Sequence, residues 1–202
     1  MPRMCATLAI IGWSLRAARD GGAVNQVVAP ALRAVERYAG AALRSGAYFQ
    51  QTWSPRAGFD LRAGGRADRH EWAASPAWTP YAALAVPLPG RVRLSLSWSQ
   101  AAQFAEIRQF TSPRRKQLEP ERAQHGSLVV ERALGERSRL RFEVFERRDR
   151  NGLFRPLGEP RLVNGRLVNA LIPAPWENSL RGRVRGWQAM WQGRSANGLT
   201  GW

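Results

Sequence analysis

The feature that most constrains this chain is a strict alternation of apolar and polar residues along several short segments. The clearest segment spans residues 91–99, where every second residue is apolar: Val92, Leu94, Leu96 and Trp98. The residues between them are arginines and serines. Because successive side chains of a β-strand point to opposite faces, this pattern predicts a strand with one apolar and one polar face.

The same period of two recurs from residue 46 onward. Leu140, Phe142 and Val144 alternate with charged residues, and weaker alternations occur over residues 59–66 and 187–191. We therefore expect a series of strands of about ten residues each. This fold class is all-β.

The connections between these segments alternate in length. Short segments with turn-forming Gly, Pro or Asn occur at residues 54–58, 87–90, 134–137 and 195–198. Longer polar segments lie between them, at about residues 68–77, 100–122 and 150–180, and the last contains a hairpin signal over 161–168. Short turns that alternate with long loops are typical of bacterial outer-membrane β-barrels.

A barrel of this kind exposes one strand face to lipid and the other to a polar lumen, and its closure pairs every backbone group. The residues that we expect to face lipid are Val92, Leu94, Leu96, Trp98, Leu140, Phe142 and Val144. Five tryptophans near the expected strand ends suit the boundary between membrane and water: Trp53, Trp78, Trp98, Trp187 and Trp191.

Residues 1–45 have a different pattern. Apolar residues recur at helix-like spacing over residues 27–44, at Val28, Leu32, Val35, Ala39 and Leu43, which predicts a short amphipathic helix. We therefore divide the chain into a helical or irregular N-terminal segment, 1–45, and a β-region, 46–202. No apolar stretch reaches the roughly 20 residues of a membrane-spanning helix.

The charge predicts an anionic partner, because 31 Lys and Arg residues outnumber 15 Asp and Glu residues and give a net charge of +16. Catalysis has no visible basis. The motif that begins at His70 lacks the second histidine of a zinc-protease helix, and Cys5 is the only cysteine. The sequence predicts no enzyme activity, no cofactor and no metal site.

Arginines interleaved with aromatic residues, over 147–150 and 181–186, leave a second function open: a soluble, arginine-rich, all-β protein that binds nucleic acid. The strand-like spacing of the arginines favours a barrel, in which they line the lumen or contact lipopolysaccharide phosphates at the loops. A third interpretation is a non-functional gene fragment, because an open sheet exposes unpaired edges and aggregates.

Several segments, in order, resemble the barrel part of TonB-dependent outer-membrane receptors, and the resemblance covers residues 46–202. The segments are 47–53, 64–69, 94–104, the Leu-Glu-Pro-Glu stretch that begins at Leu118, 142–150, 178–182 and 194–202. The resemblance implies an antiparallel up-and-down meander of about seven or eight strands, as part of a larger transmembrane barrel. It also implies the outer membrane of a Gram-negative bacterium and energy-coupled uptake of a metal chelate, vitamin or glycan.

Such receptors carry an N-terminal plug and an energy-coupling box, and residues 1–45 show neither. We therefore interpret the sequence as part of a receptor that does not transport alone. Its expected partners are outer-membrane lipid and lipopolysaccharide, with an inner-membrane energy-coupling complex only where a plug is supplied elsewhere. Ligand contacts are expected in loops 100–122 and 150–180, at Phe104, Arg108, Arg114, Arg155, Arg161 and Trp176.

Overall fold

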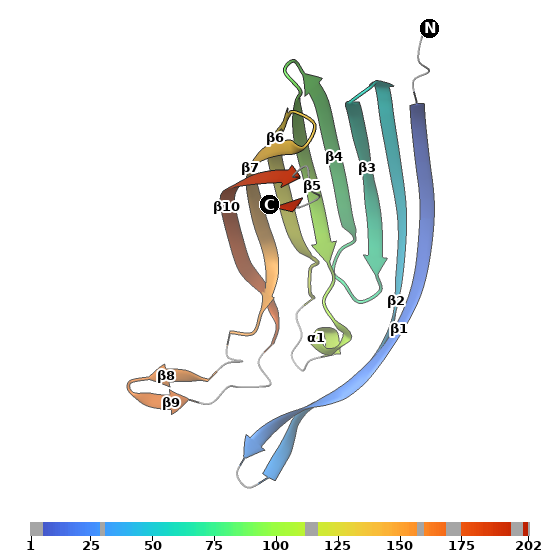
Figure 1. Ribbon diagram of the computed structural model, residues 1–202. Coiled ribbons are helices and arrows are strands. Elements are labelled where there is room, and N and C mark those ends of the chain that lie inside the picture. Colours follow the sequence, from blue (N-terminus) through green and yellow to red (C-terminus); the bar gives the residue numbers. More distant parts are fainter. Residues whose placement is uncertain are drawn as a thin grey trace.

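The computed structural model describes residues 6–28, 31–111, 117–156, 160–168, 175–194 and 200–201. Nearly all of them lie in strands (Figure 1). The elements in chain order are β1 (Ala6–Val28), β2 (Ala31–Arg56), β3 (Phe59–His70), β4 (Ala77–Leu88), β5 (Val92–Gln103), α1 (Ile107–Thr111), β6 (Glu121–Leu134), β7 (Ser138–Phe154), β8 (Arg161–Val163), β9 (Arg166–Val168), β10 (Glu177–Arg194) and β11 (Thr200–Gly201).

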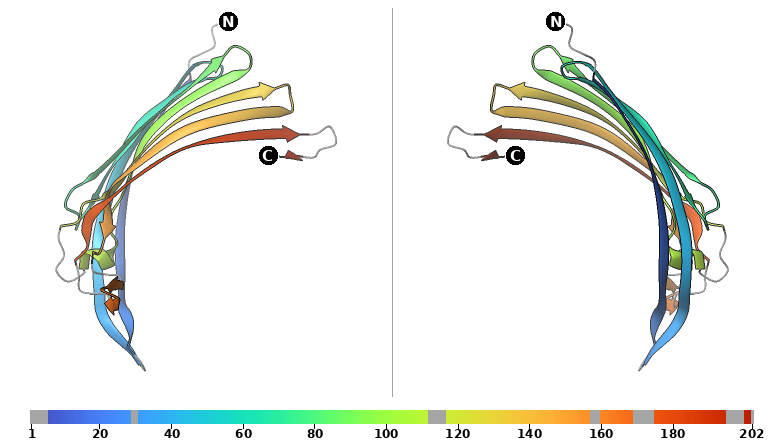
Figure 2. Two further views of the ribbon diagram at one scale, coloured as in Figure 1. Left: turned by 90° about the vertical axis from the view of Figure 1, so that its left-hand side faces the viewer. Right: turned by 90° about the vertical axis from the view of Figure 1, so that its right-hand side faces the viewer.

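Nine of the described strands form one sheet in the order β1-β2-β3-β4-β5-β6-β7-β10-β11, and β8 pairs only with β9. Every pairing in the large sheet is antiparallel. Figure 2 shows that the sheet is bent into an open, curved wall with β1 at one edge and β10 and β11 at the other. The all-β, up-and-down meander expected from the sequence is confirmed.

From β2 onward, short turns join the strands at one end of the wall, and longer connections join them at the other end (Figure 1). Gly58, Gly90 and Gly135 have φ of 79°, 76° and 72° in the short turns, a backbone conformation that glycine adopts without steric cost. The 161–168 hairpin is confirmed as β8 and β9, and its turn residues Asn164 and Gly165 both have positive φ. The turn expected at 195–198 lies outside the described residues.

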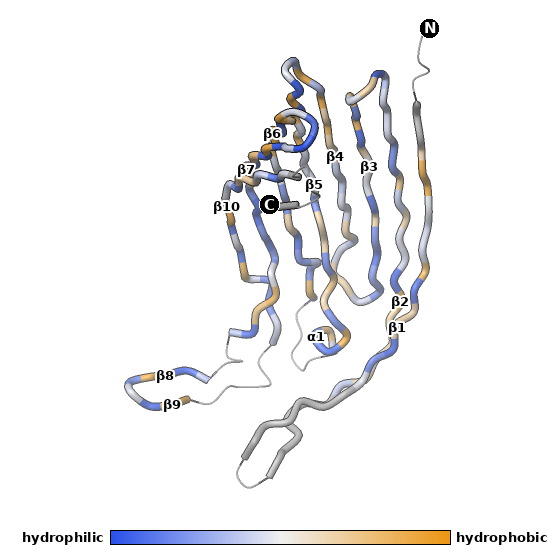
Figure 3. Tube along the Cα trace, in the orientation of Figure 1, coloured by the Kyte–Doolittle hydropathy of each residue, from blue (hydrophilic) through white to orange (hydrophobic). Residues whose placement is uncertain are grey.

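The register of the strands separates an apolar face from a polar face. Directly paired residues of antiparallel strands share a face, so the pairings trace a row across seven strands. This row is apolar throughout: Trp53, Leu61, Leu84, Leu96, Leu128, Val144 and Trp187. We call the face that carries it the apolar face. Figure 3 shows the resulting interleaving of apolar and polar residues along the strands.

All seven residues expected to face lipid lie on the apolar face. Leu94 pairs with Val86 and Val130, and Val130 pairs with Phe142, so the register brings the two predicted segments, 92–98 and 140–144, together. Leu96 and Phe142 are 54% and 46% exposed, although both are large and apolar. Contact of these residues with lipid stays a prediction.

The helix predicted over residues 27–44 is wrong. β1 and β2 form a long antiparallel hairpin, paired from Ala6 with Ser54 to Val28 with Ala31, and β2 runs through the expected boundary at residue 45. An isolated helix of this length is marginal in water, whereas the hairpin pairs the backbone groups of one strand with those of the other. The overlooked signal is Ile11, Trp13 and Leu15 at alternate positions on the apolar face.

The strands are longer than the ten residues expected, with 12 in β3, 17 in β7 and 18 in β10. The ladders of backbone hydrogen bonds continue past the apolar row toward the long connections. Among the described residues, no helix is long and apolar enough to cross a membrane.

Candidate functional site

The polar face of β1, β2 and β3 is built around one buried carboxylate. Asp68 is 4% exposed, and Arg66 donates to it from both Nε and Nη2, at 2.6 and 2.8 Å. Arg44 on β2 approaches the same carboxylate at 3.3 Å, and Arg66 also donates to the Ser14 hydroxyl on β1 at 3.0 Å. A carboxylate that is out of water requires such partners, so the network ties three strands together.

A second network lies on the polar face of β6, β7 and β10. Arg141 pairs with Glu131 at 3.1 Å and with Glu143 at 2.8 Å, and the Gln188 side chain donates to Glu143 at 2.7 Å. The three charged side chains are about one-eighth to one-third exposed, and Gln188 is exposed, so water reaches this network. The polar face therefore presents paired charges and hydrogen-bonding groups, which suit a hydrated lumen or a polar protein surface rather than an apolar partner.

An aromatic cluster lies at the loop end of the sheet, where α1 packs against β1 and β2 and against His70 at the end of β3. The cluster centres on the buried residues Ala105, Phe110 and Leu118, with Trp72, Ala73, Leu153 and Trp176 packed against it. His70 stacks on Phe110 with ring centres 4.9 Å apart. These contacts pack the described parts of the connection between β5 and β6, residues 104–111 and 117–120, into a compact cap.

The return of the long loop into β6 is held by side-chain hydrogen bonds. Asn178 on β10 accepts from the Glu119 amide at 2.8 Å and donates to the carbonyls of Glu119 and Asn151, at 2.9 and 2.7 Å. Leu118 is 1% exposed beside it, and the Ser75 hydroxyl donates to the Glu119 carboxylate. The Leu-Glu-Pro-Glu segment is thus a structural clamp, and β6 begins at its last residue, Glu121.

Five of the six residues expected to contact ligand lie in the described part of the chain. Phe104 is 7% exposed and lies beneath the Arg44 guanidinium, whereas Arg108 is half-buried on α1. Arg155 lies over the Trp176 ring at 5.0 Å, and Arg161 is exposed on β8. Arg114 lies outside the described residues. Among the described residues of this set, Arg155 and Trp176 are in contact, and ligand contact by all six stays a prediction.

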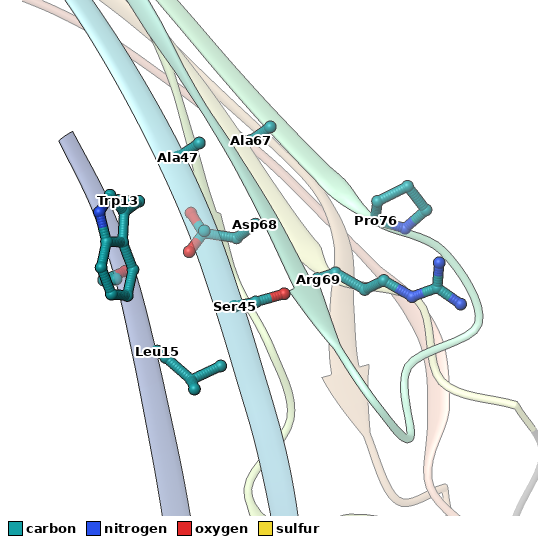
Figure 4. Close-up of a pocket in the computed structure, with 10 residues that line it drawn as sticks. Trp13, Leu15, Ser45, Ala47, Ala67, Asp68, Arg69 and Pro76 are labelled. Atoms are coloured by element: carbon teal, nitrogen blue, oxygen red, sulfur yellow. The ribbon is translucent and has the colours of Figure 1, made fainter. Parts of the chain in front are cut away.

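A shallow depression of about 430 Å³ lies where β1, β2 and β3 run side by side. Figure 4 shows Trp13 and Leu15 projecting from β1 beside the small side chains of Ser45, Ala47 and Ala67. Trp13 is 82% exposed there. The sequence interpretation missed this region because it assigned no strand before residue 46.

The described residues contain no group of three His, Cys, Asp or Glu side chains placed to hold a metal ion. The side chain of His70 lies instead among aromatic rings, with Phe104 at 5.5 Å and Trp72 at 6.4 Å from it. His125, on β6, stacks on Phe145 with ring centres 6.1 Å apart. Both histidines are therefore part of aromatic packing.

No protein-family model matches the sequence, and no curated protein matches it. Solved structures do match. The siderophore receptor PirA from Pseudomonas aeruginosa is similar over 92% of this chain and 36% of that one, with a TM-score of 0.67 and 13% identity. A mutant of the ferric enterobactin receptor PfeA from Pseudomonas aeruginosa is similar over 97% of this chain and 31% of that one, with a TM-score of 0.68 and 14% identity.

A third structure is the hemophore receptor HasR from Serratia marcescens, solved with its hemophore HasA and heme. It is similar over 93% of this chain and 40% of that one, with a TM-score of 0.58 and 14% identity. The chain thus spans between 31% and 40% of the length of these three receptors. Their identities are low, so the likeness establishes the fold: the resemblance to part of a TonB-dependent receptor barrel is confirmed at that level.

Proposed function

We propose that this chain forms part of the barrel wall of a TonB-dependent outer-membrane receptor that takes up a scarce ligand. The observation that carries the proposal is the unbroken apolar row from Trp53 to Trp187, which crosses seven strands on one face of the sheet. The opposite face carries the ion-paired networks of Asp68 and Arg141. An apolar exterior opposite a polar interior is the arrangement of a transmembrane barrel.

The dimensions of the apolar face support a membrane span. On β4, every apolar-face residue from Trp78 to Leu88 is apolar, because Pro80, Ala82, Leu84 and Val86 lie between them. Ten residue steps cover about 33 Å along a strand. With the strand tilt of about 40° found in membrane barrels, this length gives about 25 Å across the membrane, which is the usual height of their apolar band.

A metal chelate is the ligand class that the structural neighbours favour over a vitamin or a glycan. Two of the similar structures are receptors for siderophores, among them ferric enterobactin, and the third was solved with a hemophore and heme. In the receptor that we propose, loops 100–122 and 150–180 contact the ligand, a plug occupies the polar face, and an inner-membrane complex supplies energy through that plug. The protein lies in the outer membrane of a Gram-negative bacterium and is not an enzyme.

The alternative, a soluble nucleic-acid-binding protein, gains no support from the exposed side chains. A soluble protein rarely leaves a wide apolar patch open to water. Trp78, Leu96 and Trp187 are 55%, 54% and 70% exposed on one face of the sheet. In a membrane barrel, lipid covers this apolar face, whereas a soluble nucleic-acid-binding protein gives no reason for exposing it.

Adjacent residues on opposite faces provide the test. In a Cys5→Ser background, Leu96→Cys and Ser97→Cys would each be labelled with an environment-sensitive dye, and the chain would be refolded into lipid vesicles. We expect brominated lipid to quench the dye at residue 96 and an aqueous quencher to reach the dye at residue 97. Equal responses at the two positions, or a folded β-sheet that forms without lipid or detergent, would contradict the proposal.

A further inference from the structure

The apolar face becomes cationic toward the loop end of β7 and β10. Two residues beyond the apolar row, the register places Trp98, Gly126, Glu146 and Arg185 side by side. Two residues further, it places Gln100, Gln124, Arg148 and Arg183 side by side. On β7 the change from Val144 to Arg148 takes about 13 Å of strand. An arginine cluster therefore borders the apolar row.

One carboxylate orders the arginines of this cluster. Glu146 accepts hydrogen bonds from Arg183 Nε and Arg185 Nε, each at 2.9 Å, and from Arg148 Nε. We call these four residues the Glu146 cluster. Arg148, Arg183 and Arg185 remain 47%, 49% and 62% exposed. A single negative charge thus fixes three guanidinium groups in place and leaves an excess of positive charge facing outward.

Two more arginines extend the positive surface. Arg150 and Arg181 line, together with Arg148 and Arg183, a shallow depression of about 590 Å³ between β7 and β10. Asp149 also borders this depression, and it is paired with Arg147 at 2.9 Å. Guanidinium groups bind phosphate oxygens through two parallel hydrogen bonds, so several of them around one depression suit a phosphorylated ligand.

Resting on the proposed barrel function, we propose that the Glu146 cluster, with Arg150 and Arg181, binds the phosphate groups of lipopolysaccharide. The long connections of a bacterial barrel lie on the extracellular side, so the loop end of this sheet meets the outer leaflet. The cluster shares a face with the apolar row, which places phosphate groups beside the arginines and acyl chains beside Val144 and Trp187. Charge and position both fit this lipid.

The test measures binding of lipid A to the full chain refolded in detergent micelles. The substituted protein carries Arg148→Gln, Arg181→Gln and Arg183→Gln. The control carries Arg91→Gln, Arg132→Gln and Arg137→Gln, which remove the same charge near the short turns. We expect the first protein to bind lipid A about tenfold more weakly, because charge-assisted hydrogen bonds are lost. The control should bind within about twofold of the original chain, since distant surface charges contribute little.

A conservative variant keeps the test decisive if the glutamine variant does not fold. Arg148→Lys with Arg183→Lys retains the charge but loses the paired hydrogen bonds, and we expect an intermediate loss of affinity. Four results would each overturn the inference: unchanged binding in both cluster variants, equal losses in the cluster and control variants, equal binding of dephosphorylated lipid A, or displacement by phosphatidylglycerol or RNA at the same concentration as lipid A.

The dye experiment separates this inference from the proposed function. One outcome is that the dyes at residues 96 and 97 respond to opposite quenchers while the cluster variants bind lipid A as tightly as the original chain. That outcome supports the barrel proposal and contradicts only the lipopolysaccharide site. If the two residues respond alike, the barrel proposal itself fails.

Discussion

Glycines on the strands mark places where a neighbouring side chain lies flat against the sheet. A Cβ atom at Gly46 would lie 2.5 Å from Asp68 Oδ1 and 2.8 Å from Arg66 Nη2. At Gly186 it would lie 2.6 Å from the Phe145 ring. At both positions the absent side chain leaves room for a group from the adjacent strand. Gly46 makes room for the ion pair of Asp68 and Arg66, and Gly186 makes room for the Phe145 ring.

We expect Gly46→Ala to destabilise the folded chain by about 1–3 kcal/mol, because the new methyl group displaces the Asp68 carboxylate and the Arg66 guanidinium. Gly126→Ala is the matched control, since its Cβ would meet nothing nearer than 3.9 Å. There we expect no loss, or a gain of about 0.5–1 kcal/mol from the less flexible unfolded chain. Urea unfolding in lipid vesicles measures both, and equal effects would contradict the steric argument.

The individual elements differ in what holds them. The strands rely on backbone ladders, whereas the cap at the loop end relies on a few side chains from distant elements. Asn178 from β10 fastens the segment that leads into β6, and Glu71 beside β3 both donates to and accepts from the Leu43 backbone, each at 3.0 Å. Because a few side-chain hydrogen bonds hold the cap in place of a ladder of backbone hydrogen bonds, a single substitution can destabilise it.

We expect Asn178→Ala to loosen the cap while the sheet stays intact, because three hydrogen bonds to the backbone disappear. The local cost is about 2–3 kcal/mol. Hydrogen exchange should accelerate at the amide of Ala74, which donates to the Leu118 carbonyl at 3.0 Å. Ser179→Ala, at an exposed neighbouring position, is the control. Unchanged exchange at Ala74 in the Asn178 variant would show that the clamp is dispensable.

The whole molecule is a single curved layer rather than two packed layers. Its described residues contain few buried hydrophobic side chains, and most of these lie in the cap rather than along the strands. A sheet without a second layer leaves its apolar face for another apolar phase to cover. In the proposed receptor that phase is lipid, and stability therefore depends on the membrane.

We therefore expect an introduced charge to destabilise the folded chain strongly on the apolar face and much less on the polar face. Leu96→Arg is expected to destabilise the chain in lipid vesicles by about 2–4 kcal/mol if residue 96 lies near the middle of the bilayer. Ser97→Arg, one residue along β5, projects to the polar face and should cost much less. Unfolding by urea in vesicles measures the difference, and equal costs at the two positions would count against a membrane span.

The sequence predicted the alternating strand segments, 59–66, 91–99, 140–144 and 187–191, because their signal is local. Each alternating segment specifies its own two faces, and Asn164-Gly165 specifies its own turn. β1 was not predicted, although Ile11, Trp13 and Leu15 alternate, because three alternating residues are a short signal and the spacing over 27–44 fits a helix. Spacing alone does not decide between a short helix and a strand when the pairing partner is unknown.

The sequence by itself determined which residues share a face within the alternating strands after residue 46, where the short turns fall and that apolar and polar faces are separate. Only the tertiary structure decided the contacts between residues far apart in the chain: Asp68 with Arg44, Asn178 with Glu119, and Glu146 with Arg183 and Arg185. The physical reason is register. The backbone of a single strand fixes which of its side chains share a face. Which charged residues of different strands lie close together depends on the register in which the strands pair.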